Sequence, residues 1–588
     1  MATVNVKING INVTCPADAT ILEAARAAGI EIPTLCYMKD LNEIGACRIC
    51  VVEVKGARTL IAACVYPVSE GMEIFTNTDK VRDSRKMTLE LILSNHRKDC
   101  LTCVRNQHCE LQKLSADFGV DTIRFADDNL QPQIEDSTTH LIRDNSKCVI
   151  CRRCTAVCKQ DQDVAVIGPA ERGFATHISC AIGRDLGEMG CVSCGQCITV
   201  CPTAALTEKE DLDQVYAALA DPTKHVVVGT APAVRVALGE SFGMPMGTNV
   251  EGKMVAALRR LGFDGVFDVA VAADITVMEE GTELLQRLDA DKNLPNITSC
   301  CPSWVQYCEM YHPDFIPNLS SCKSPQQMFG AMMKVYYAKK MNLDPKDIFV
   351  VSVMPCTAKK PEIRREDQQA IPGLYDLDAV VTVRELARMI KKAGLLFTEL
   401  PDEEFDPAFG LSTGAGYVFG VSGGVTEAAL RTVSEIALGK PLESVDFTEV
   451  RGVAGLKEAE YDLGGKKVRV AVVSGLKNAG ELLKRIRAGE VSYDMLEVMS
   501  CSGGCVNGGG QPIQAGVTRS FNDLRTLRGN ALHEGEANRP GRKAHESPIV
   551  KTLYSELLEK PGSHKAHDWL HTTYKQQPKY PGLESEQA

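Results

Sequence analysis

Four cysteines that lie far apart in the sequence stand in similar surroundings. Cys301 lies in TSCCPSW, Cys356 lies in MPCTAK, and Cys501 and Cys505 lie in MSCSGGC. Each has small or apolar neighbours, with a proline or a glycine close by. Four thiolates in an apolar pocket are the ligands of a cubic iron–sulfur cluster, and glycine lets backbone amides approach such a bulky group. These cysteines therefore predict a [4Fe–4S] site in the C-terminal half of the chain.

Two runs of cysteines between residues 138 and 212 form the strongest local pattern. Each run follows C-x2-C-x2-C-x3-C, and the second ends in Pro202. This spacing is typical of bacterial two-cluster ferredoxins, in which the fourth cysteine of each run binds the other cluster. Lys159 stands where the first run usually has a proline, a minor departure. We therefore predict one cubane on Cys148, Cys151, Cys154 and Cys201, and a second on Cys191, Cys194, Cys197 and Cys158.

One histidine and three cysteines precede these runs, between residues 81 and 137. They are His96, Cys100, Cys103 and Cys109, spaced H-x3-C-x2-C-x5-C. A helix is predicted just before them, over Val81–Ser94. This ligand set suits a zinc ion as well as a [4Fe–4S] cluster, so the spacing alone leaves both open. His108, next to Cys109, is predicted not to be a ligand.

The first 80 residues carry four more cysteines after a distinctive order of elements. Apolar alternation predicts strands at Val4–Ile8 and Ile11–Val13 around a turn at Gly10, and then a helix from Thr20 to Gly29. The cysteines are Cys36, Cys47, Cys50 and Cys64, spaced C-x10-C-x2-C-x13-C. This order resembles a β-grasp ferredoxin with a [2Fe–2S] cluster, although the plant-type spacing differs. A zinc site is the alternative, but all-cysteine zinc sites usually consist of two CxxC pairs.

The rest of the chain supplies the elements that must bring the distant cysteines together. From about residue 213, helices alternate with short apolar strands, which is typical of an α/β domain with a largely parallel sheet. The predicted strands are His225–Gly229, Gly265–Val269, Phe349–Val353, Ala379–Thr382 and Val468–Val473. One or two helices are predicted over His545–Lys560, and the tail after Lys575 is predicted to be loose. The predicted fold class is a multidomain chain of α+β and α/β type, with domains at 1–80, 81–137, 138–212, 213–535 and 536–588.

The composition argues against several classes of function. The net charge of −11 and the lack of a basic patch argue against nucleic-acid binding. No stretch approaches about 18 uninterrupted apolar residues, so no membrane span is predicted. The N-terminus alternates like a strand, so a secretory signal is not expected. The 24 cysteines therefore predict metal ligation in a reducing cytoplasm rather than disulfide bonding.

The three C-terminal motifs resemble the signatures of the [FeFe]-hydrogenases. They are TSCCPSW at 298–304, MPCTAKKPE at 354–362 and EVMSCSGGCVNGGGQP at 497–512. The N-terminal modules follow the order found in the large, multi-cluster members of this family, and the first two also resemble modules of respiratory complex I. The resemblance implies an enzyme that interconverts H₂ with two protons and two electrons. It implies one [2Fe–2S] cluster, three accessory [4Fe–4S] clusters and an H-cluster, which is a [4Fe–4S] cubane joined to a di-iron subsite with CO, cyanide and an azadithiolate bridge.

The resemblance also implies roles for the residues around the H-cluster. The cubane ligands would be Cys301, Cys356, Cys501 and Cys505, with Cys505 as the bridging thiolate, and His96 would be a ligand of an accessory cluster. Lys359 would donate a hydrogen bond to one cyanide, and Pro232 would line the pocket near the other. The residues packed around the di-iron ligands would be Gln326, Met354 and Met499. Ala233 departs from the serine that many members have at this place.

A dry site also needs a route for protons. Cys300 cannot easily ligate the same cubane as its neighbour Cys301, and in the family this cysteine carries the proton. Steps of three and four place Glu280, Glu283 and Arg287 on one face of a helix. With Ser320 as a relay between the carboxylates, the set resembles the family's proton pathway, whereas the spacing alone would favour a solvated charged face. The cysteines without a role are predicted to be small buried residues: Cys15, Cys180, Cys308 and Cys322.

Other functions would share parts of this sequence. A hydrogenase-like iron–sulfur assembly factor would not be expected to keep Cys300, Lys359 and the full relay. An electron-transfer subunit would share residues 1–210 but lack the three motifs, and an H₂ sensor tends to lose parts of the proton route. Neither G-x-G-x-x-G nor G-x4-G-K-[ST] is present, so flavin or NAD(P) binding in this chain is not predicted. The predicted electron partner is a ferredoxin or a flavin-containing NAD(P)-binding subunit of a hydrogenase complex, with the second slightly favoured.

Overall fold

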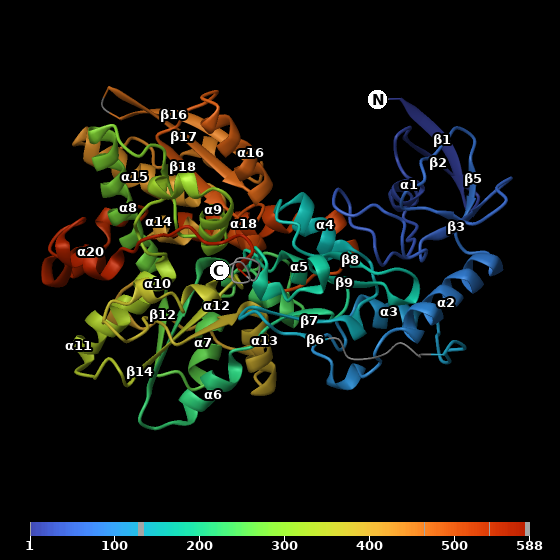
Figure 1. Cartoon of the computed structure of the whole chain (residues 1–588), viewed down its shortest axis with the longest axis horizontal. Helices are drawn as coiled ribbons and strands as arrows, with labels where there is room; N and C mark the ends of the chain where they lie inside the picture. Colours follow the sequence, from blue (N-terminus) through green and yellow to red (C-terminus); the bar gives the residue numbers. More distant parts are fainter. Residues whose placement is uncertain (1, 127–133, 464, 540, 582–588) are drawn as a thin grey trace.

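The computed structural model describes residues 2–126, 134–463, 465–539 and 541–581. In Figure 1 the first 125 residues or so, in blue, lie to one side and the larger C-terminal part lies on the other. Residues 138–212, in teal, lie between them. We refer to residues 1–80, 81–137 and 138–212 as the first, second and third modules.

The first module is a five-stranded sheet with one helix. The strand order is β2-β1-β5-β3-β4, with bounds Thr3–Ile8 (β1), Ile11–Pro16 (β2), Val51–Val54 (β3), Ile61–Ala62 (β4) and Glu73–Phe75 (β5). Helix α1 (Ile21–Ala27) begins after Thr20, whose hydroxyl accepts from the Glu23 amide while the Glu23 carboxylate accepts from the Thr20 amide. The predicted order of strand, turn, strand and capped helix is confirmed.

The second and third modules consist of short helices held by loops. The second contains α2 (Asp79–Ser94), which confirms the predicted helix, and α3 (Glu110–Asp117). The third contains α4 (Arg153–Gln160) and α5 (Gln196–Thr199), each of which follows a cysteine turn. Its strands are β7 (Leu141–Asp144), β8 (Gly168–Ala170), β9 (His177–Ser179) and β10 (Leu206–Glu208), and β7 also pairs with β6 (Ile134–Glu135) at the end of the second module.

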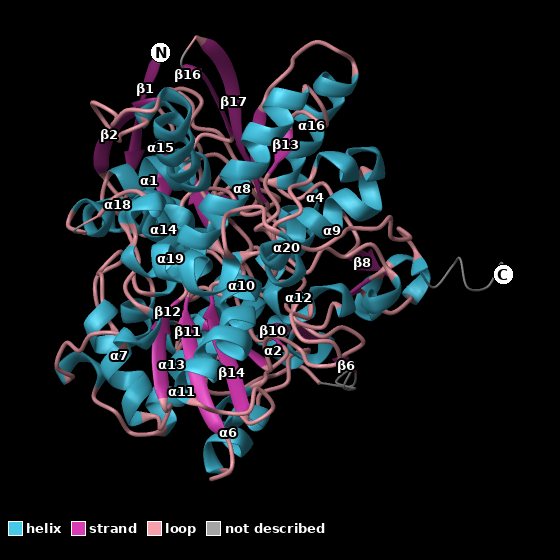
Figure 2. Cartoon of the chain, turned by 90° about the vertical axis from the view of Figure 1, so that its left-hand side faces the viewer, coloured by secondary structure: helices cyan, strands magenta, loops and turns pink. Residues whose placement is uncertain are grey.

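Two sheets form the core of the C-terminal domain (Figure 2). The first is wholly parallel in the order β12-β11-β14-β15: Gly265–Asp268, His225–Thr230, Ile348–Met354 and Ala379–Thr382. The second has the order β13-β18-β17-β16, with only β16 antiparallel: Asn296–Ile297, Met495–Met499, Lys466–Ser474 and Leu456–Leu463. The predicted α/β pattern with largely parallel sheets is confirmed, although β13, β16 and β18 were not predicted.

Helices cover both sheets, and one of them joins the two cores. Apolar residues at the start of α8 (Ala270–Ala290) pack with the first sheet, whereas Leu284 and Leu288 pack with the second. The other helices of the domain are α6 (Leu212–Ala220), α7 (Glu251–Arg260), α9 (Pro302–Tyr311), α10 (Pro325–Met332), α11 (Ala338–Met341), α12 (Lys359–Glu362), α13 (Val383–Lys392), α14 (Gly414–Tyr417), α15 (Gly424–Leu438), α16 (Leu476–Arg487) and α17 (Gly516–Phe521).

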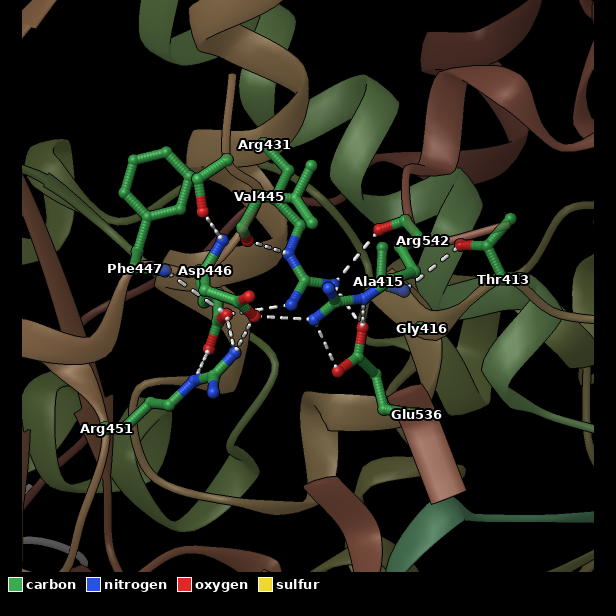
Figure 3. A network of polar contacts seen from close by, with 12 residues as sticks. Thr413, Ala415, Gly416, Arg431, Val445, Asp446, Phe447, Arg451, Glu536 and Arg542 are labelled. Atoms are coloured by element: carbon green, nitrogen blue, oxygen red, sulfur yellow. Dashed lines mark hydrogen bonds and ion pairs between the residues drawn. The ribbon is translucent and has the colours of Figure 1, made fainter. Parts of the chain in front are cut away.

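The C-terminal segment is attached to this domain by a buried ion network. Helix α18 (Leu524–Ala537) leads into it, and α19 (Pro548–Leu553) and α20 (His564–Leu570) follow. Helix α19 lies within the predicted helical range His545–Lys560, whereas α18 and α20 lie outside it. Figure 3 shows Arg431 of α15 donating to Glu536 of α18, at 2.9 Å, and Arg542 donating to the same carboxylate. Because Arg431 and Glu536 are almost fully buried, each needs the other to offset its loss of water.

The prediction of a loose tail after Lys575 is wrong for the described part of that tail. The Gln577 amide donates to the Glu309 carbonyl at 3.1 Å, and the Lys575 amide donates to the Glu309 carboxylate at 3.3 Å. These contacts hold the chain against α9, because backbone groups that find partners need not stay in water. Residues 582–588 lie outside the described residues. Among the described helices, none is long and apolar enough to span a membrane.

Candidate active site

One cavity at the ends of the parallel strands collects residues from distant parts of the chain. Its volume is about 80 Å³. Its lining includes all the residues predicted for the H-cluster pocket and the predicted proton carrier: Pro232, Cys300, Cys301, Gln326, Met354, Cys356, Lys359, Met499, Cys501 and Cys505. Pro232 follows β11, Cys356 follows β14 and Cys501 follows β18. Within each sheet the carboxyl ends of the parallel strands meet at one edge. β11 and β14 belong to the first sheet and β18 to the second, so the cavity collects loops from the edges of both sheets.

The four thiols predicted as cubane ligands are buried in this cavity. Burial raises the pKa of each, that of Cys356 to about 12, so they stay protonated at neutral pH unless a metal ionises them. Two donors already point at their sulfur atoms. Gln196 Nε2 lies 3.1 Å from Cys501 Sγ, and the Ser500 amide nitrogen lies 3.5 Å from Cys301 Sγ. Convergent thiols, amide donors and apolar walls fit an iron–sulfur cluster.

Lys359 lies at the wall of the cavity and is held by a residue that the sequence analysis did not single out. Its Nζ donates to the Glu362 carboxylate at 2.9 Å and to the Cys300 carbonyl at 3.2 Å. Burial lowers the pKa of Lys359, but the Glu362 carboxylate outweighs this and raises it. Gln326 Nε2 donates to the same carboxylate at 3.0 Å. The position of Glu362 one helical turn after Lys359 was the available signal, because residues three apart share a helix face.

The structure also brings the predicted proton-route residues together. Ser320 Oγ donates to Glu283 Oε2 at 2.7 Å, and Arg287 donates to Glu283 Oε1 at 2.7 Å. Burial, followed by the charge of Glu283, raises the pKa of Glu280 to about 8. Burial, followed by the charge of Glu280, also raises the pKa of the Cys300 thiol. The row runs from Arg287, whose side chain is 13% exposed, to the cavity, so it is not a solvated helix face.

A side branch of hydrogen bonds leaves this row at Glu283 and was not predicted. Ser321 Oγ lies 2.8 Å from His571 Nδ1 and 3.3 Å from the Glu283 carboxylate. His571 Nε2 lies 3.1 Å from Glu279, which also accepts from Tyr554 at 2.6 Å. The residues come from α8, from the loop before α10 and from the C-terminal segment, so no local motif marks them.

The cysteines of the third module line two separate cavities. One cavity, of about 30 Å³, is lined by Cys158, Cys191, Cys194 and Cys197. The other, of about 20 Å³, is lined by Cys148, Cys151, Cys154 and Cys201. The structure therefore groups the cysteines as the exchanged fourth ligand predicts, with one cysteine of each run in the cavity of the other run.

The cysteines of the first module lie close together in two pairs. Cys50 Sγ and Cys64 Sγ lie 3.3 Å apart, and the Cys47 amide nitrogen lies 3.5 Å from Cys36 Sγ. Among the described residues, the only set of three or more metal-binding side chains with ligand atoms within 4.8 Å of one another is Glu435, His545 and Glu546.

His96 is a buried histidine whose ring has a nitrogen without a hydrogen-bond partner in the described structure. It is 8% exposed, and within the described structure its Nδ1 has no hydrogen-bond partner. Burial lowers its pKa to about 4, so the ring is neutral and its lone pair is free to bind a metal. His108 is exposed on the neighbouring loop.

The third module contacts the C-terminal domain directly at the cavity. Thr357 Oγ1, one residue after Cys356, donates to the Ser193 carbonyl at 2.8 Å. A Cβ atom on Gly509 would lie 2.1 Å from the Cys194 carbonyl oxygen, so only glycine fits there. Gln196 donates to the Asn507 carbonyl at 2.9 Å as well as to Cys501. The loops of the two cluster sites are therefore in van der Waals contact.

Four family models match the chain. They are described as iron only hydrogenase large subunit, C-terminal domain (residues 224–509), 2Fe-2S iron-sulfur cluster binding domain (1–79), NADH-ubiquinone oxidoreductase-G iron-sulfur binding region (85–124) and iron hydrogenase small subunit (522–577). These matches lie over the first module, the second module, the catalytic domain and the C-terminal segment.

Curated relatives match almost the whole chain. NADP-reducing hydrogenase subunit HndD of Solidesulfovibrio fructosivorans is 46% identical over 585 residues, which cover 98% of this chain and 99% of the relative. Iron hydrogenase 1 of Clostridium pasteurianum is 41% identical over 570 residues, which cover 97% and 99%. Among solved structures, a variant of [FeFe]-hydrogenase HydA1 from Chlamydomonas reinhardtii matches with 41% identity and a TM-score of 0.56, covering 62% of this chain and 99% of that chain.

Proposed function

The chain belongs to the iron-only hydrogenase family, and from this premise we propose how its residues divide the work of the enzyme. The protein is a [FeFe]-hydrogenase that interconverts H₂ with two protons and two electrons at an H-cluster, and it carries [2Fe–2S] and [4Fe–4S] clusters. The H-cluster cubane would be held by Cys301, Cys356, Cys501 and Cys505, and Cys505 would be the thiolate that it shares with the di-iron subsite. When bound, the H-cluster supplies the iron chemistry that forms and splits the H–H bond.

The other residues of the cavity hold and shield this group. Lys359, which Glu362 fixes at the wall, presents an ammonium group to an anionic ligand, where a charge-assisted hydrogen bond is strong because water is excluded. Pro232, Gln326, Met354 and Met499 line the same space and limit the access of water. The observation that carries the proposal is this one cavity, which joins four cysteines, a held lysine and the inner end of a row of titratable side chains.

Protons reach the cavity along that row. Arg287 and Glu283 form its outer end, Ser320 passes the proton between the two carboxylates, and Glu280 passes it to the Cys300 thiol. Each step needs a group that can both gain and lose a proton, and hydroxyl, carboxyl and thiol groups do so. In the direction of H₂ oxidation the same groups carry the proton outward.

The H₂ chemistry is tested on protein produced together with hydrogenase maturation enzymes and fully loaded with iron. We expect H₂-dependent reduction of an artificial dye, and an infrared spectrum with CO and cyanide bands. A loaded sample with those bands but without dye reduction would favour an assembly factor or a sensor. Cys300→Ala is expected to keep the infrared bands and lose the dye reduction, because it removes the proton carrier and no cluster ligand.

The accessory clusters form a chain that leads electrons to and from the H-cluster. We assign the [2Fe–2S] cluster to Cys36, Cys47, Cys50 and Cys64 in residues 1–80, and a [4Fe–4S] cluster to His96, Cys100, Cys103 and Cys109 in residues 81–137. Two cubanes occupy the cavities in residues 138–212, the catalytic domain spans 213–535, and a small-subunit-like segment spans 536–588. The contact of Gln196 with Cys501 supports the third module as the last step before the H-cluster.

The electron partner at the first module is a flavin-containing, NAD(P)-binding subunit of a hydrogenase complex. The 46% identity over the whole length with a subunit of an NADP-reducing hydrogenase supports this assignment. The cysteine-rich, cluster-binding composition supports a reducing cytoplasm as the location. Purification of the native protein is expected to yield a flavoprotein in the same peak. A chain that elutes alone and exchanges electrons with a ferredoxin would contradict the assignment of a flavoprotein as its partner.

A further inference from the structure

A single arginine lies between the two cluster cavities of the third module. Arg143 is on β7, and it lines both the cavity of about 30 Å³ and the cavity of about 20 Å³. Leu206 of β10, which is paired with Arg143 in the register of the two strands, also lines both cavities. No other described residue is shared by the two linings. These two residues therefore form the wall between the two predicted cubane sites.

Arg143 is buried without a counter-charge. It is 4% exposed, and within the described structure it forms no ion pair. Its Nη1 donates to Cys180 Sγ at 3.9 Å, and its Nε is buried without a hydrogen-bond partner. Glu135, the partner of Arg143 on β6, accepts hydrogen bonds from two backbone amides instead. A buried cation without a partner is costly, so this position requires negative charge close by.

The protein groups around the two cavities do not supply this negative charge. Among the described lining residues none is a carboxylate, and the only other permanent charge is that of Arg152, whose side chain is exposed. His140 lines the larger cavity, but burial, followed by the charge of Lys360, lowers its pKa to about 4, so the ring is neutral. Four thiolates give a cubane a net negative charge, which grows with each electron that it takes up. Two cubanes therefore fit the unpaired guanidinium.

A fixed positive charge between two cubanes acts on both in the same direction. The reduction potential of a cubane depends on the charge around it, on hydrogen bonds to its sulfur atoms and on its exposure to water. Because Arg143 is buried, water and salt screen its charge only weakly, and the charge stabilises the reduced, more negative form of each cubane. The same charge offsets the repulsion between two reduced cubanes that lie side by side.

We propose that Arg143 raises the reduction potentials of both cubanes of the third module and so lets the two be reduced together. This rests on the proposed assignment of the two cubanes to these cavities. Oxidation of one H₂ releases two protons and two electrons. The protons leave along the row from Cys300 to Glu283, and each cubane of the third module takes up one electron. The third module then holds both electrons of one turnover until the electron partner collects them.

The test is a redox titration of the fully loaded enzyme, followed by paramagnetic resonance. Two neighbouring reduced cubanes broaden each other's signal, which distinguishes this pair from the other clusters. In the wild type the two cubanes should be reduced over the same range of potential. For Arg143→Gln we expect the equilibrium constant for reduction of each cubane to fall roughly tenfold, which lowers each potential by about 59 mV for a one-electron couple. Arg143→Lys keeps the charge and should restore most of this difference.

Arg152→Gln is the matched control, because Arg152 lines one of the same cavities but its side chain is exposed, so water and salt screen its charge. The proposal is overturned if Arg143→Gln titrates as the wild type does, or if Arg152→Gln lowers the potentials as much as Arg143→Gln.

The wild type alone also decides the question, even if Arg143→Gln loses its iron. A wild type that reduces one cubane completely before the other begins to be reduced would overturn the proposal. Iron and sulfide contents too low for two cubanes in the third module would instead overturn the cluster assignment in the proposed function. The chemical analysis thus separates the two failures.

Discussion

Glu280 and Glu283 lie one turn apart on α8 but have different surroundings. Glu283 accepts hydrogen bonds from Ser320, Ser321 and Arg287. Glu280 is 2% exposed, and its raised pKa of about 8 follows from burial and from the nearby charge of Glu283. A carboxyl group with this pKa gains and loses protons near neutral pH, as the inner member of a proton relay must.

Replacing Glu280 by glutamine is expected to slow dye-linked H₂ turnover by roughly 100-fold or more, because the amide keeps the shape but cannot relay a proton. The same variant also tests the raised pKa of Glu280, through its effect on the stability of the folded protein. The pKa of Glu280 is about 8 in the folded protein against an ordinary value of 4.5, so the folded state keeps a proton that the unfolded state loses. This contribution to wild-type stability is full below about pH 4.5 and is lost as the pH rises to about 8.

The measurement is the thermal unfolding of both proteins between those pH values. The unfolding temperature of Glu280→Gln relative to the wild type should rise with pH, since glutamine has no proton to lose. The titrating groups that do not interact with Glu280 are shared and cancel in the difference, whereas Glu283 and Cys300 are coupled to it. Identical pH profiles of the two proteins would contradict the raised pKa, whatever the effect on turnover.

At the scale of elements, the contact between the loop after β18 and the turn before α5 is set by glycines. Gly509 meets the Cys194 carbonyl, and a Cβ atom on Gly195 would lie 2.3 Å from Thr357 Oγ1. The backbone at Gly509 therefore packs directly against the backbone at Cys194. In the proposed electron route, this contact shortens the distance between the third module and the H-cluster. Larger residues at these positions would separate the third module from the catalytic domain without replacing a ligand.

We expect Gly509→Ala to slow electron transfer between the third module and the H-cluster, because a methyl group 2.1 Å from the Cys194 carbonyl oxygen forces the loops apart. The rate at which H₂ reduces the accessory clusters, followed by rapid-freeze paramagnetic resonance, should fall, while the infrared bands of the H-cluster remain. Gly168→Ala in the third module is the control, since a Cβ atom there meets nothing within 4 Å. Equal reduction rates in the two variants would show that the contact does not limit the transfer.

At the scale of the whole molecule, the parts that sequence predicted are those set by local spacing. Cysteine runs dictate which ligands meet, as the two cavities of the third module illustrate, and apolar strands dictate the parallel sheet. The contacts between modules were not predictable in this way. Gln196 reaches Cys501 across 305 residues, and His571 reaches Ser321 across 250. Such pairs form only when folded modules pack against one another, and the hydrophobic periodicity of the sequence carries no information about that packing. For the same reason the tail after Lys575 was wrongly predicted to be loose.

A single buried ion pair joins all the modules. Arg153 of the third module is 1% exposed and donates to the Glu110 carboxylate of the second at 2.7 and 3.0 Å. It also donates to the Cys36 carbonyl of the first module at 3.3 Å. Glu110 in turn accepts from the Gly516 amide of the catalytic domain at 3.1 Å. Arg153 and Glu110 together therefore contact four parts of the chain.

Arg153→Ala is expected to destabilise this junction by about 3–5 kcal/mol, because it leaves the Glu110 charge without its partner. The matched control is Arg82→Ala, which removes an exposed ion pair with Asp79 on α2 and should cost about 0–1 kcal/mol. We expect Arg153→Ala to lower the first unfolding transition and to expose the modules to limited proteolysis. Dye reduction at the H-cluster should persist, while electron exchange with a flavoprotein at the first module falls. If Arg153→Ala unfolds and is cleaved like Arg82→Ala, the modules are held together by their apolar contacts instead.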